Sequence, residues 1–122
     1  MSSRLAATGL RAIKEQRQAQ KNEASLLYAQ SLFEALLEVA NLLQKQTLLQ
    51  QREKAQHKVY ISNMETEALA LRNYNAGLIE IDTLLEAQQS TISAKRDWFN
   101  IRLNRVYNRA DLLLALGGQI EE

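Results

Sequence analysis

Apolar residues recur at helical spacing along most of the chain. In the clearest row an apolar residue returns every seven positions: Leu78, Leu85, Ile92, Phe99, Val106 and Leu113. This period predicts one seam of a coiled coil. A simple two-stranded zipper would need a second apolar row, but the companion positions are mostly polar: Ile81, Gln88, Lys95, Arg102 and Arg109.

The first half of the chain is amphipathic in two patches. One predicted face consists of Leu26, Phe33, Leu36, Leu37, Ala40 and Leu43, and the other of Val59, Ile61, Met64, Ala68 and Leu71. Between them the stretch QKQTLLQQREKAQHK is polar on most sides. A helix this polar is expected to line water or to pack into a larger wall rather than to fill a core.

Helix breakers divide the pattern at one point. The 122 residues include no proline and four glycines, and Gly77 is the only breaker between Gly9 and Gly117. Two long runs without a breaker predict an all-α fold, a long antiparallel helical hairpin that is coiled-coil-like and has unequal arms. The turn is expected near residues 75–79, with Gly77 at positive φ, so that residues 78–116 pair with 39–74. Gly117 is expected to end the second helix.

Several short motifs follow one another in a recognisable order. YNAGLIEIDTLLEAQQS places an aromatic residue, a glycine and a Leu-x-x-Ala-Gln sequence at Tyr74, Gly77, Leu84, Ala87 and Gln88. Further along the chain comes the motif LLLALGG. Two motifs come before the turn: GLRA, and YAQSLFEALLEVANLL, whose matching residues are Tyr28, Ala35, Glu38, Val39 and Leu43. Across residues 9–118 this order resembles the C-terminal repeat of the TolC-type outer-membrane efflux proteins. The family's signal peptide, first repeat and barrel strands have no counterpart here.

The resemblance implies a fragment of a channel that conducts exported solutes passively through a periplasmic α-helical tunnel. Residues 1–9 would be a flexible or strand-derived segment, 10–118 the hairpin and 119–122 a disordered tail. The expected partners are further subunits of a trimer, a periplasmic adaptor protein and an inner-membrane pump. The full-length parent would lie in the outer membrane and periplasm, whereas this chain alone is expected to be soluble.

The resemblance also implies two sets of site residues. The adaptor-docking tip would comprise Asn75, Ala76, Gly77, Leu78 and Ile79. Polar candidates for the channel mouth are Tyr74, Glu80, Asp82, Thr83 and Glu86. Thr83 occupies a position where family members often have aspartate, so the charge of the family's channel gate cannot be assigned to this chain. The alternative is that Leu78 and Ile79 cap the hairpin, and that the chain is a stand-alone soluble coiled-coil interaction module.

Composition and charge narrow the remaining classes of function. The net charge is +1 and there is no cysteine, so neither a dedicated nucleic-acid binder nor a thiolate site is indicated. His57 lacks a second ligand four residues on, Trp98 is expected to pack, and Lys95, Arg96, Arg102, Arg105 and Arg109 are expected to form a solvated or channel-lining face. No phosphate loop or nucleophile–base pair is present, so the sequence predicts no enzyme, metal or cofactor. No signal peptide or unbroken apolar span of ~20 residues is visible, and we expect no membrane-spanning segment.

Overall fold

The computed structural model describes residues 2–120 and contains two helices. Helix α1 covers Ser2–Asn75 with 74 residues, and helix α2 covers Ile81–Ile120 with 40 residues. Within residues 2–120 there is no strand, so the predicted all-α hairpin with unequal arms is confirmed. The chain divides into two compact units, one ending at Glu38 and the other beginning at Val39.

The first unit is a single stretch of α1 whose side chains are exposed, apart from a half-buried Ala35. Residues 2–9 are helical, so the predicted flexible or strand-derived N-terminal segment is wrong. These residues include Arg4, Leu5, Ala6 and Ala7, which are good helix formers, and the segment has no proline. One glycine at position 9 costs helix stability but does not end the helix.

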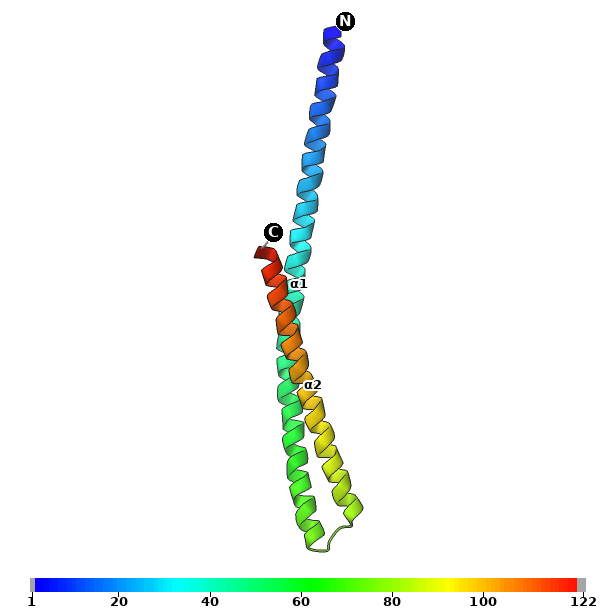
Figure 1. The fold of residues 1–122 in the computed structure, drawn as a ribbon, viewed down its shortest axis with the longest axis vertical. Coiled ribbons are helices and arrows are strands. Elements are labelled where there is room, and N and C mark those ends of the chain that lie inside the picture. The colour runs from blue at the N-terminus through cyan, green and yellow to red at the C-terminus, as the bar shows by residue number, and fades with distance from the viewer. Residues whose placement is uncertain (1, 121–122) are drawn as a thin grey trace. The chain divides into compact units, whose positions relative to one another are not determined.

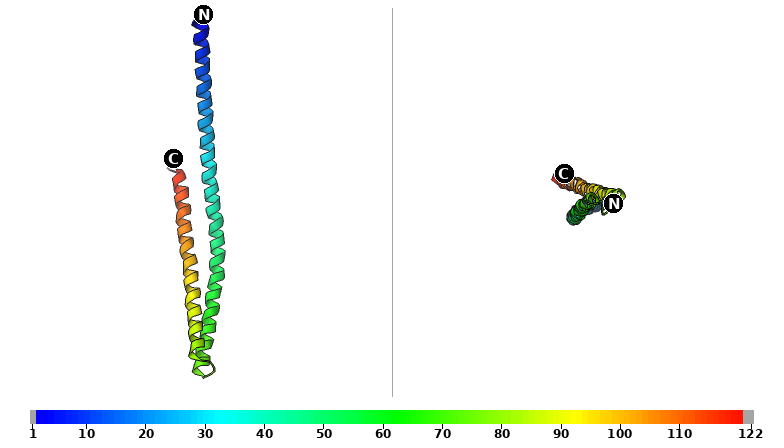
Figure 2. Two further views of the ribbon diagram at one scale, coloured as in Figure 1. Left: turned by 90° about the vertical axis from the view of Figure 1, so that its right-hand side faces the viewer. Right: turned by 90° about the horizontal axis from the view of Figure 1, so that it is seen from below.

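The second unit is an antiparallel hairpin, in which residues 39–75 of α1 lie beside α2 (Figures 1 and 2). Its turn occupies residues 76–80, close to the predicted 75–79. Gly77 has a φ of 75° and is the only residue with positive φ among those described, as predicted. The Leu78 N–H donates to the Asn73 carbonyl at 2.8 Å, and the Gly77 N–H donates to the Tyr74 carbonyl at 3.0 Å. These two bonds form a Schellman motif, which satisfies the last carbonyls of α1.

The packing seam between the helices follows alternate spacings of three and four residues on both helices. Helix α1 contributes Val39, Leu42, Gln46, Leu49, Glu53, Gln56, Tyr60, Asn63, Glu67 and Ala70, all buried or half-buried. Helix α2 contributes Leu84, Ala87, Thr91, Ala94, Trp98, Ile101, Arg105, Asn108, Leu112 and Ala115. The predicted antiparallel pairing of 78–116 with 39–74 is therefore confirmed, since Thr91 contacts Asn63 and Asn108 contacts Leu42.

The predicted apolar seam is wrong by one residue. Every member of the row from Leu78 to Leu113 is exposed, while the row that begins at Leu84 is buried or half-buried. Both rows have the seven-residue period, but neighbouring residues point ~100° apart on a helix. The helices pack through the row with more small and polar side chains, and Thr91, Arg105 and Asn108 of that row form hydrogen bonds to α1 across the seam.

Helix α2 continues past the predicted stop. Gly117 and Gly118 lie within the helix, and neither has positive φ. The stretch LLLAL before them favours helix strongly enough to extend it through both glycines. Residues 119 and 120 are also helical, which corrects the predicted disordered tail at those two positions; residues 121 and 122 lie outside the described part of the chain.

Candidate interaction surfaces of the hairpin

A partly buried ion pair holds the middle of the seam. The Arg105 guanidinium donates to Glu53 Oε2 across the two helices. Arg102 Nε lies 3.5 Å from the other carboxylate oxygen of Glu53. The Glu53 side chain is 16% exposed, that of Arg105 32% and that of Arg102 52%, so the two contacts with Glu53 differ in solvent screening.

Asn108 is the most deeply buried polar residue in the seam, at 1% exposure. Its Nδ2 donates to the Leu42 carbonyl at 3.0 Å and to Gln46 Oε1 at 2.9 Å. Its Oδ1 has no partner among the described residues. A single buried asparagine of this kind is a means by which coiled coils select one register at a cost in stability.

An aromatic cluster lies next to Arg102, one of the two arginines that contact Glu53. The Trp98 ring stacks on Tyr60 at a centroid distance of 5.5 Å and contacts His57 at 4.7 Å and Phe99 at 5.3 Å. The Arg102 guanidinium lies 5.2 Å from the Trp98 ring centroid, which is cation–π distance. Trp98 therefore packs, as predicted, and His57 is an exposed residue that rests on it.

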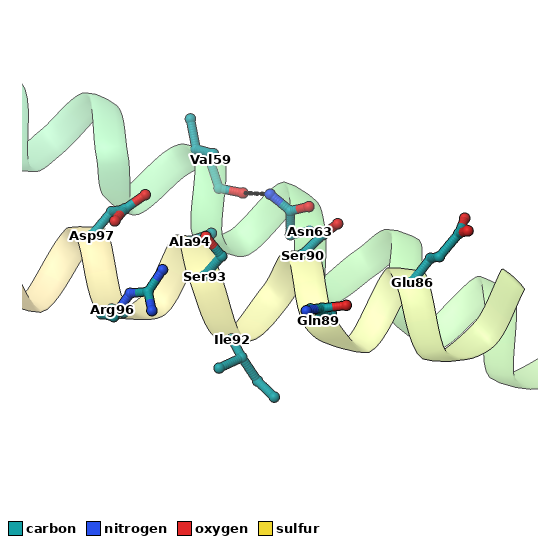
Figure 3. Close-up of a pocket in the computed structure, with 10 residues that line it drawn as sticks. All are labelled: Val59, Asn63, Glu86, Gln89, Ser90, Ile92, Ser93, Ala94, Arg96 and Asp97. Carbon is teal, nitrogen blue, oxygen red and sulfur yellow. Dashed lines mark hydrogen bonds between the residues drawn. The ribbon is translucent and has the colours of Figure 1, made fainter. Parts of the chain in front are cut away.

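Helix α2 exposes an outer row of apolar side chains: Leu85, Ile92, Phe99, Val106 and Leu113. Their exposed fractions run from 48% at Phe99 to 68% at Ile92. Figure 3 shows Ile92 pointing away from α1. This side of the hairpin exposes the residues that sequence analysis assigned to its core.

Helix α1 exposes most of its apolar residues as well. Both predicted faces of α1 lie in solvent, including Leu43, Ile61, Met64 and Leu71 within the hairpin. The polar stretch between those faces supplies Gln46, Leu49, Glu53 and Gln56 to the seam instead. The seam of the hairpin therefore mixes apolar residues with charged and amide side chains, while many large apolar side chains stay exposed, an arrangement that indicates further contacts.

Basic residues line one edge of the outer row of α2. Three basic residues, Lys95, Arg102 and Arg109, each follow a member of the outer row by three positions and are exposed. Lys95 Nζ lies 5.9 Å from the Phe99 ring centroid, which places this basic edge next to the outer row. The acidic residues Asp97 and Asp111 follow these bases by two positions, so they project from another side of the helix.

The predicted basic face is only partly correct. Lys95, Arg96, Arg102 and Arg109 are exposed, as a solvated face requires. Arg105 instead enters the seam and pairs with Glu53. Arg105 lies seven residues after Trp98 and seven before Leu112, and this spacing identifies it as a seam residue.

A shallow groove runs between the helices (Figure 3). Its charged lining residues have both signs: Glu86, Arg96 and Asp97 of α2. Its polar lining residues include Asn63 of α1 and Ser90 and Ser93 of α2. Asn63 Nδ2 donates to the Val59 carbonyl of its own helix at 2.8 Å. The groove is open and polar, and it brings together neither a nucleophile and a base nor a set of metal ligands; among residues 2–120 no group of three His, Asp or Glu could hold a metal ion.

The structure places most predicted site residues together at the tip, residues 74–83. Leu78 is 73% exposed, whereas Ile79 is half-buried, so Leu78 presents the larger apolar surface. Tyr74, Glu80, Asp82 and Thr83 are exposed around it. The Glu80 carbonyl accepts the first backbone hydrogen bonds of α2, from Thr83 N at 3.2 Å and Leu84 N at 3.5 Å. Glu86 lies further along α2, in the groove.

Comparison with known proteins finds no matching family model, curated protein or solved structure. One helix, α1, contains an 18-residue window apolar enough to cross a membrane by length and composition, and none of that window is buried. No membrane-spanning segment was predicted, because the chain has no unbroken apolar run of ~20 residues. Core helices and signal sequences pass the same measure, so the window assigns no membrane role.

Proposed function

We propose that this hairpin is a wall element of a TolC-type efflux channel, in which neighbouring helices cover its outer apolar surface and its tip docks a periplasmic adaptor. The observation that carries the proposal is the number of large apolar side chains that the hairpin leaves exposed. Charged and amide side chains meet in the seam, while the outer row of α2 and Leu43, Ile61, Met64 and Leu71 of α1 are exposed. A wall of side-by-side helices would cover these surfaces.

The tip supports the docking part of the proposal. The Schellman motif at Gly77 uses only the backbone of Leu78, and the Leu78 side chain is left 73% exposed. An apolar residue at the end of a rigid reversal is suited to enter a pocket on a partner. Ile79 is half-buried, so it would contact the partner over a smaller area than Leu78 and would mainly support the Leu78 side chain.

A transplant experiment tests the proposal. The chain's hairpin, residues 39–118, would replace the corresponding C-terminal hairpin of a TolC-type channel, and export and adaptor cross-linking would be measured. The proposal expects both to be retained, and expects Leu78→Asp with Ile79→Asp to abolish cross-linking without loss of trimer. Gln89→Asp with Asn104→Asp is the matched control, because both residues are exposed on α2 away from the tip. Wild-type cross-linking in the tip variant would refute docking through Leu78.

The same exposed outer row would also serve a stand-alone coiled-coil module. A transplant that assembles and binds helical partners, yet conducts nothing and binds no adaptor, would favour that second function. Both functions require the outer row to be covered, and they differ in whether the tip has a partner.

A further inference from the structure

The outer row of α2 has basic borders over most of its length. Four of its members follow one another every seven residues: Ile92, Phe99, Val106 and Leu113. Side chains three or four positions away are their neighbours on the helix surface, and none of those neighbours is acidic. Four of them are exposed bases: Lys95, Arg96, Arg102 and Arg109. This part of α2 therefore presents an apolar row between positive charges.

A second exposed apolar face, with acidic borders, lies on α1 in residues 22–38, here called the upstream segment. It carries three large exposed side chains whose spacings of seven and four residues place them on one face: Leu26, Phe33 and Leu37. Glu23 precedes Leu26 by three residues and Glu34 precedes Leu37 by three, so both carboxylates border this face. The upstream segment contains three acidic residues and no base, a net charge of −3.

We propose that the upstream segment of one copy of the chain docks on the outer row of α2 of a second copy. The two surfaces are complementary in both respects, since each is apolar along its centre and their borders have opposite charge. Their lengths also agree. The upstream segment measures about 25 Å along the helix, and the outer row from Ile92 to Leu113 about 31 Å.

Charge disfavours the contacts between identical surfaces. Two outer rows packed on one another would bring the bases of both copies together, and two upstream segments would do the same with their carboxylates. Like charges that face one another across an interface cost affinity, whereas the mixed contact pairs acid with base. Because each copy has one surface of each kind, the contact is head-to-tail, and a closed ring or a reciprocal pair satisfies both surfaces.

This contact rests on the part of the proposed function in which the outer row is covered, and it specifies the surface that covers it. It does not involve the tip. The transplanted hairpin, residues 39–118, lacks the upstream segment, so a failure of adaptor docking and a failure of this contact are observed in different experiments.

Two charge-reversal variants of the full chain test the contact. The segment variant is Glu23→Lys with Glu34→Lys, and the row variant is Arg96→Glu with Arg109→Glu. Neither pair lies in the seam of the hairpin. In sedimentation equilibrium at low salt, each variant alone should self-associate about tenfold or more weakly than wild type, because its two surfaces then have borders of the same sign.

An equimolar mixture of the two variants is the decisive sample. The lysines of the segment variant meet the glutamates of the row variant, and the unchanged surfaces of the two variants still match one another. The mixture should therefore associate within about threefold of wild type. High salt should reduce the difference between wild type and the variants, since it screens exposed charges.

The controls change the net charge equally at exposed positions outside both surfaces. Glu65→Lys with Asp111→Lys matches the segment variant, and Arg52→Glu with Lys58→Glu matches the row variant. Each control should associate within about threefold of wild type. Circular dichroism of every variant confirms that helix content is kept, so that lost association is not lost folding.

Four outcomes would overturn the proposal. A monomeric wild type would exclude the contact outright. Wild-type association of the row variant would show that Glu23 and Glu34 meet another surface, such as the basic residues 4–21 of a second copy. Equal loss in the controls would show repulsion by net charge alone. A mixture that associates no better than either variant would show that the two surfaces do not meet.

Discussion

The partly buried carboxylate of Glu53 allows a quantitative test of the seam, because two arginines contact it with different exposure. Arg105 is two-thirds buried and donates to Oε2, whereas Arg102 is 52% exposed and lies 3.5 Å from Oε1. A charge-assisted hydrogen bond with limited solvent access contributes about 2 kcal/mol to the free energy of unfolding. An exposed ion pair contributes about 0.5 kcal/mol.

Double-mutant cycles separate the two contacts. The variants are Glu53→Gln, Arg105→Gln, Arg102→Gln and the two doubles that contain Glu53→Gln, unfolded in urea at one protein concentration. Far-UV circular dichroism measures the helix, and fluorescence of Trp98, the only tryptophan, reports the seam. We expect a coupling energy of about 2 kcal/mol for Glu53 with Arg105 and about 0.5 kcal/mol for Glu53 with Arg102. Equal couplings, or none for Arg105, would refute the assignment of this pair to the seam.

Two further predictions concern the turn and the buried amide. Gly77→Val should destabilise the hairpin by about 1–2 kcal/mol, because a β-branched residue is strained at a φ of 75°. The control is Gly117→Ala, which should instead raise the melting temperature, because Gly117 is helical and has open space around it. A melting temperature of the Gly77 variant equal to that of wild type would contradict the strain. Asn108→Leu should stabilise the hairpin by about 1 kcal/mol, since it removes a buried oxygen without a partner, and a fall in stability would show that the bonds to Leu42 and Gln46 outweigh that oxygen.

The fold could be predicted from the sequence because its determinants are local. Absence of proline, long runs of helix formers and one isolated Gly77 define two helices and a reversal, and the short connection then makes the helices pair antiparallel. The helix ends were predicted less well. Ser2–Asn75 begins earlier than expected and α2 passes through Gly117, because neighbouring helix formers outweigh one or two glycines.

The seam could not be predicted from apolarity, because the packed row is the more polar of two rows with the same period. Glu53, Arg105 and Asn108 read as surface residues when each is considered alone. Their burial depends on partners from the other helix, which only three-dimensional pairing brings within reach. The signal that was present was the alternation of three and four residues from Leu84 through Ala115. The roles of the tip residues in adaptor docking stay a prediction.

The central claim is that the outer row of α2 is a contact surface and not the core of the hairpin. Sedimentation equilibrium of the wild-type chain and of Ile92→Asp with Val106→Asp tests it most directly. We predict that the wild type associates to a mass above the 13.9 kDa of one chain. The variant should be a helical monomer that keeps its cooperative melting, because both residues are more than 60% exposed. A wild type that is monomeric at ~100 µM, or a variant that unfolds, would contradict the account.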